Sequence, residues 1–231
     1  MKKVLMVTMI TLTSFIGFGQ QKISGFGKLQ LGMSVNDIPE LTNSIEVKNS
    51  NDYIMKVYQN TSNKVYEVFA DTTDKYNTMG SFDKRVRVFH LGNYNVTENI
   101  NIKDVDLKFF NNKLYSIHVG DYKIDELLTT KYGEPKKDFE EKEKYYTNGY
   151  GMKITKKDQT FKHTYNTNIP NVECYYELMS WHDSKGEKLI VSFTILEDKI
   201  ISDVVSKEVD MVKSRINKRE EDKKKGLVSG F

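Results

Sequence analysis

The sequence predicts an α+β protein in which a few helices pack on one face of an antiparallel sheet. Val, Ile, Tyr, Phe and Thr recur with a period of two residues, and turns rich in Asn, Asp and Gly separate these runs. Apolar residues at helical spacing occur in only a few segments. Strands joined by short turns pair antiparallel, and the apolar side of such a sheet needs a cover of helices.

The strand signals are clearest in a hairpin over residues 105–119. Apolar and polar residues alternate on both sides of Asn111 and Asn112, and asparagine tolerates the positive φ that a tight hairpin turn demands. A second hairpin is expected over residues 189–201, with its turn at residues 197–198.

Three segments carry helix signals. Ser34 and Asp37 form the pattern of a capping box, and Pro39 keeps that helix short. Asp121 can cap a second helix, which Gly133 ends. The third, near the C-terminus, places four apolar residues on one stripe: Val205, Val209, Val212 and Ile216.

The two expected hairpins can be superposed, with Val105 over Val191, and each follows a helix signal. This likeness suggests two tandem units of a helix followed by a β-meander, although hairpins also resemble each other by chance. We expect a first unit over residues 20–119 and a second over residues 120–206, the two forming one continuous domain. Residues 207–231 would be a C-terminal helix and charged tail.

Residues 1–19 have the pattern of a secretory signal peptide. Lys2 and Lys3 precede an apolar run over residues 4–18, and Gly19 supplies the small residue before the cleavage point. Cleavage there would leave a soluble chain in the periplasm or outside the cell. The rest of the chain has no second long apolar stretch, so we expect no integral membrane span after cleavage.

Charge and cysteine content restrict the partners and the chemistry. The chain has a formal charge of +3, and loss of Lys2 and Lys3 with the signal brings it close to neutrality. A binder of nucleic acid would present a basic face to the phosphates, so nucleic acid is not an expected partner. Cys174 lies in an alternating segment, which indicates a buried small side chain rather than a nucleophile.

Two short motifs resemble known exported domains. Leu31-Gly32-Met33-Ser34 before a short helix, and later Lys131-Tyr132-Gly133-Glu134-Pro135, are similar to bacterial domains of the β-lactamase-inhibitor-protein type. The first motif also resembles the small periplasmic domain of outer-membrane assembly lipoproteins. The resemblance implies a helix pair on an antiparallel sheet and a role in binding other proteins. Two features depart from it, because Pro39 interrupts the helix and the lipoproteins' anchoring cysteine is missing.

Signatures of catalysis are missing from the sequence. The four histidines show no metal-ligand spacing, and no nucleophile elbow or phosphate-binding loop occurs, so neither a metal nor a cofactor is expected. An imidazole, a carboxylate and a large ring come together only at Trp181, His182 and Asp183. This segment is first a predicted β-turn, and its alternative interpretation is the site of an envelope hydrolase or transferase, with His182 and Asp183 as catalytic candidates.

Tyrosines are concentrated in one part of the chain. Half of the 14 tyrosines lie between residues 132 and 176, and tyrosine supplies rigid amphipathic area to interfaces but is also a common strand residue. Tyr145, Tyr146 and Tyr150 follow a charged run, so we expect these three to be exposed and to bind a partner. The leading hypothesis is therefore an exported bacterial module, noncatalytic, that binds an envelope or periplasmic protein.

Overall fold

The computed structural model describes residues 22–49, 64–70, 81–147, 151–183 and 186–228. The signal-peptide prediction and Tyr150 lie outside these residues. Nine described strands form one sheet: β3 (Ile45–Asn49), β4 (Val65–Ala70), β5 (Val86–Thr97), β6 (Ile100–Phe110), β7 (Lys113–Val119), β8 (Lys136–Thr147), β9 (Lys153–Tyr165), β10 (Val172–His182) and β11 (Lys188–Asp198).

The strand order in this sheet is β3-β4-β5-β6-β7-β11-β10-β9-β8. Only β3 and β4 run parallel, and every other neighbouring pair is antiparallel. The predicted hairpin over residues 105–119 is confirmed as β6 and β7. Asn111 and Asn112 have φ angles of 49° and 62°, as its tight turn requires.

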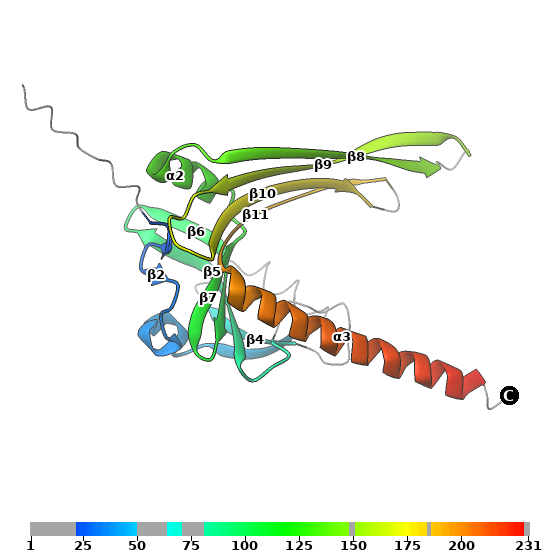
Figure 1. Cartoon of the computed structure of the whole chain (residues 1–231), viewed down its shortest axis with the longest axis horizontal. Coiled ribbons are helices and arrows are strands. Elements are labelled where there is room, and N and C mark those ends of the chain that lie inside the picture. Colours follow the sequence, from blue (N-terminus) through cyan, green and yellow to red (C-terminus); the bar gives the residue numbers. More distant parts are fainter. Residues whose placement is uncertain (1–21, 50–63, 71–80, 148–150, 184–185, 229–231) are drawn as a thin grey trace, which may run out of the picture.

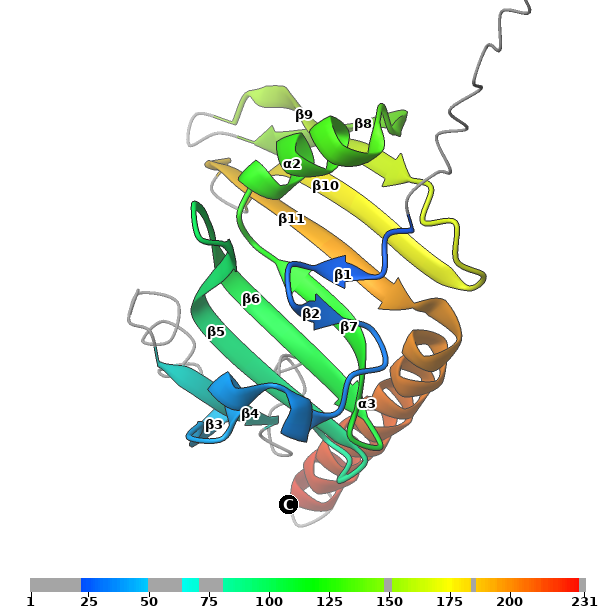
Figure 2. The same cartoon turned by 90° about the vertical axis from the view of Figure 1, so that its left-hand side faces the viewer.

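One face of the sheet carries the main core. The N-terminal segment crosses this face as a small hairpin, β1 (Gly25–Phe26) and β2 (Leu29–Gln30), followed by the 3-10 helices η1 (Val35–Asp37) and η2 (Pro39–Leu41). Helix α2 (Lys123–Tyr132) covers the same face beside them (Figure 2). The residues that they bury include Phe89, Leu107, Phe109, Ile117, Ile124 and Leu128.

Both local helix signals on this face are confirmed. Ser34 and Asp37 form the capping box of η1, and Pro39 starts η2, where its missing amide costs nothing. Tyr122 holds the N-cap position of α2 instead of Asp121, which still accepts the amide of Lys123 at Oδ1 over 3.1 Å. Gly133 ends that helix with a φ of 92°, which glycine adopts readily.

The opposite face of the sheet is covered by α3 (Lys199–Val228), which appears behind the sheet in Figure 2. Val205 of this helix packs against a second, smaller apolar cluster: Tyr66, Val68, Val86 and Val88. The expectation that the helices pack on one face is therefore wrong. The first face is already filled by the N-terminal segment and α2, so the last helix packs where apolar strand residues are still uncovered.

The second predicted hairpin is also wrong, because β11 ends at Asp198 and α3 begins at Lys199 without a loop. Asp198 Oδ1 accepts the amide of Ile201 over 3.1 Å and so caps the first turn of the helix. Residues 199–201 are helical, which removes half of the superposition on which the tandem units rested. The sheet itself continues across the expected boundary at residue 119, because β11 pairs with β7.

Strands β8 to β11 extend well beyond α2 (Figure 1). We call their outer part the arm: residues 139–147, 153–161, 178–182 and 188–193. Along β8, every residue except Tyr146 is exposed. None of the described helices has an apolar stretch long enough to cross a membrane.

Candidate functional site

The arm carries a strip of apolar side chains on the side of the sheet that faces α3. Trp181 pairs with Leu189 and Met179 with Val191, and Phe193 continues the row along β11. Paired residues of antiparallel neighbours share one face of a sheet. We call these five residues the apolar strip.

The register fixes which face this is. Tyr165 lies on the α2 side, because its hydroxyl donates to Asp125 Oδ1 over 2.6 Å and meets Thr129 Oγ1 at 2.8 Å. Cys174 is directly opposite Tyr165 and is fully buried on the same side, as its alternating pattern predicted. Since successive strand residues alternate, the odd-numbered residues of β10 and β11 point to the α3 side.

Two of the five residues of the apolar strip are exposed, and Trp181, Met179 and Phe193 are half-buried. The side chains of Leu189 and Val191 each keep 42% of their accessible surface. Figure 1 shows the reason, because α3 leaves the sheet where β11 ends and diverges from the arm as it runs outward. The helix packs near the middle of the sheet, and the arm lies beyond its reach.

The other face of the arm also carries exposed apolar side chains. Phe139 and Phe161 pack against each other with ring centroids 4.7 Å apart, and Ile190 keeps 62% of its surface exposed. Glu141 and Lys157 lie farther out on the same face than the phenylalanine pair and form an ion pair of 2.7 Å. Both faces of the arm therefore expose apolar side chains, and on the α3 side they form one row across the paired residues of β10 and β11.

The two described tyrosines of the predicted binding set do not lie together. Tyr145 is 70% exposed and lies on the α2 side of β8. Tyr146, its neighbour, points to the α3 side, where its hydroxyl donates to the backbone oxygen of His182 over 3.0 Å. Adjacent residues of a strand face opposite ways, so these two side chains cannot belong to one flat contact surface.

The predicted catalytic candidates, His182 and Asp183, form structural hydrogen bonds at the end of the β10–β11 hairpin. His182 meets Asp158 rather than Asp183, with 3.2 Å between Nδ1 and Oδ1, and its amide donates to the same oxygen over 3.0 Å. Asp183 Oδ1 accepts the amide of Glu187 over 2.8 Å, which closes the turn. Lys144 also pairs with Asp158, and mainly its hydrogen bond lowers the pKa of that carboxyl group. These contacts tie β9 and β8 to the hairpin.

Sequence reasoning missed a chain of titratable groups in the middle of the α3-facing side. Asp106 Oδ1 lies 2.7 Å from His90 Nδ1, and its other oxygen lies 3.7 Å from His118 Nδ1. The His118 ring packs edge-on against Phe193 with centroids 5.1 Å apart. Burial lowers the pKa of His118, although Asp106 acts in the opposite direction. Only the strand register brings these residues together, so their spacing along the chain carries no signal of the contact.

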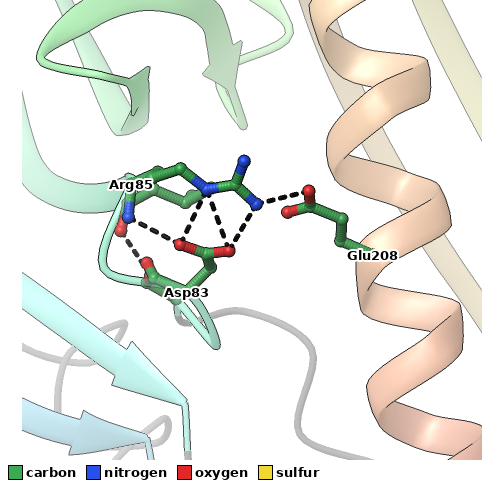
Figure 3. A network of polar contacts seen from close by, with 5 residues as sticks. Asp83, Arg85 and Glu208 are labelled. Atoms are coloured by element: carbon green, nitrogen blue, oxygen red, sulfur yellow. Dashed lines mark hydrogen bonds and ion pairs between the residues drawn. The ribbon is translucent and has the colours of Figure 1, made fainter.

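A second charged network joins the sheet to α3 (Figure 3). Asp83 accepts the Arg85 amide over 2.7 Å and the Arg85 guanidinium over 2.8 Å, and Glu208 of α3 binds the same guanidinium. The hydrogen bonds from Arg85 lower the pKa of Asp83 to about 2. The network fixes where α3 lies against the start of β5.

Within the described ranges, no group of three or more His, Cys, Asp or Glu side chains is placed to hold a metal ion. No family model matches the sequence, and no curated protein or solved structure is significantly similar to it. Function must therefore be inferred from the surfaces of this chain alone.

Proposed function

We propose that this protein is an exported, noncatalytic module that binds a partner protein through the apolar strip of its arm. The observation that carries the proposal is the exposure of Leu189 and Val191 next to the half-buried Trp181 and Met179 on the same face. Exposed contiguous apolar area of this kind on a folded domain is typical of an interaction surface. The resemblance of residues 31–34 to exported domains that bind other proteins also supports a protein partner.

The surroundings of the strip favour a protein over a lipid surface. Around it, the α3-facing side of the arm carries charges of both signs, including Lys142, Lys144, Asp158 and Glu177. A membrane-binding face would have an excess of lysine and arginine around its apolar side chains. An apolar centre with tryptophan, surrounded by a mixed polar rim, is typical of protein interfaces.

Site-specific photo-crosslinking in the producing bacterium tests this proposal. A benzoylphenylalanine at position 191 should form one discrete adduct with another protein. The same group at position 190 is the matched control, because it is equally close to the tip but points to the other face. Val191→Asp in a chain crosslinked through position 189 should reduce the adduct, and Ile190→Asp should leave it unchanged.

Three outcomes would contradict the proposal. Equal adducts from positions 190 and 191 would show that contact is not specific to the strip. An adduct of twice the mass of the chain would assign the strip to self-association. The third is the absence of any protein adduct while crosslinking to lipid is detected, which would assign it to the membrane surface.

A further inference from the structure

A cavity of about 380 Å³ lies between α3 and the sheet, at a distance from the arm. Part of its wall is aliphatic, from β5 and α3, and the Asp83–Arg85–Glu208 network forms another part; the aliphatic residues are Val86, Val88, Val205, Val209 and Val212. Tyr115 and Lys108 contribute from β7 and β6. A concave site that combines apolar side chains with polar groups able to orient a ligand is the usual form of a site for a small molecule.

Lys108 is the feature of this cavity that needs an explanation. It is half-buried on the α3-facing side of β6, between Val88 and Ser116 in the register. It forms no ion pair or hydrogen bond with any residue that the structure describes. An ammonium group without an acidic partner at the wall of a cavity can bind the anionic group of a ligand.

Asp83 and Glu208 also line the cavity, and one carboxylate oxygen of Glu208 has no hydrogen-bond partner among the described residues. Glu208 and Asp83 hold Arg85, and Asp106 lies against His90 and His118. The positive charge of Lys108 is close enough to His118 to contribute to the lowering of the His118 pKa. Arg215, also at the cavity, has no ion pair among the described residues.

The cavity lining thus combines three positive groups, Arg85, Lys108 and Arg215, and two carboxylates with aliphatic side chains. At roughly 30 Å³ for each water-sized group, it would hold about a dozen non-hydrogen atoms. We propose that this cavity binds a medium-chain aliphatic carboxylate, with the carboxylate on Lys108 and the chain among the valines of α3 and β5. This inference is independent of the proposed function, because the apolar strip and the cavity share no residue.

Titration of the purified mature protein with decanoate tests the proposal, with 1-decanol as the neutral probe of equal chain length. Decanoate should bind saturably at one site. Lys108→Met keeps the length of the side chain and removes its charge, so decanoate affinity should fall at least tenfold while decanol binding changes little. Lys103→Met is the matched control, because Lys103 is an exposed lysine of the same strand and should leave both affinities unchanged.

A second variant tests the cavity itself. Val209→Phe would fill the space between α3 and the sheet, so it should abolish binding of both probes while circular dichroism remains unchanged. The proposal would be overturned if decanoate showed no saturable binding, or if Lys108→Met bound it as tightly as the parent. Tighter binding of decyl phosphate than of decanoate would reject the carboxylate as the ligand class.

Discussion

The inner sheet and the arm are made of strands from the same sheet, but they are stabilised in different ways. Strands β5 to β7 bury Phe89, Leu107 and Phe109 completely beneath the N-terminal segment and α2. In the arm, Phe139 and Ile190 keep 56% and 62% of their surface exposed. Hydrogen bonds between strands are present in both regions, so the difference lies in the cover over the two faces.

This difference suggests that the inner sheet and the arm have different roles. Burial of apolar area supplies most of the stability of a domain, so the inner sheet provides most of the stability of this fold. Apolar side chains in the arm add little to stability while they face water, and they become favourable only when a second surface covers them. The same substitution should therefore change stability by very different amounts in the inner sheet and in the arm.

The largest contrast is expected from phenylalanine truncation. Phe109→Ala should lower the free energy of unfolding by about 3–5 kcal/mol, because it removes a fully buried ring and leaves a cavity. Phe139→Ala in the arm should cost less than about 1 kcal/mol. Urea unfolding measures both, and similar losses would show that the arm belongs to the cooperative core.

The next contrast concerns an ion pair in the inner sheet. Arg87 binds both carboxylate oxygens of Glu67, at 2.7 and 2.8 Å, and Glu67 is buried. Arg87→Met would leave that carboxylate without its partner and should cost about 2 kcal/mol, a figure reduced because Arg87 itself is partly exposed to water. The double variant with Glu67→Met should recover part of the loss, and no recovery would exclude the unpaired charge as its cause.

His118 should make stability depend on pH. Burial lowers its folded-state pKa below the unfolded value of about 6.5. Below pH 6.5 the unfolded chain therefore takes up a proton that the folded chain resists, and stability should fall until the folded-state pKa is reached. His118→Phe should flatten the dependence of the urea midpoint between pH 7.5 and 5, whereas His163→Gln should retain it. An unchanged slope in His118→Phe would assign the acid sensitivity to other groups.

The smallest effect is expected from the ion pair between Lys157 and Glu141 in the arm. The Lys157 side chain is exposed and that of Glu141 is partly exposed, so Lys157→Met should leave the urea midpoint within experimental error. The hydrogen bond from Lys157 lowers the pKa of Glu141, and loss of that bond should raise the pKa toward its ordinary value. Carboxyl-carbon chemical shifts can follow this change. A clear loss of stability would show that the arm depends on its surface charges.

Local signals predicted the local structure well. The hairpin at Asn111-Asn112, the capping box at Ser34 and the end of α2 at Gly133 all depend on neighbouring residues, and the structure confirms each. The turn at residues 197–198 failed because Asp198 suits a helix cap as well as a hairpin turn. A local pattern cannot choose between these two uses, because the choice depends on the surface against which residues 199–228 pack.

The sequence by itself determined the prevalence of strands, the antiparallel hairpins and the burial of Cys174, because alternation and turn chemistry act over a few residues. Only the tertiary structure decided that the helices lie on opposite faces and that the arm extends beyond them. It also brought His90, Asp106 and His118 together, and Lys108 to the cavity under α3. These features depend on strand order and register between distant segments, which periodicity within one segment does not encode.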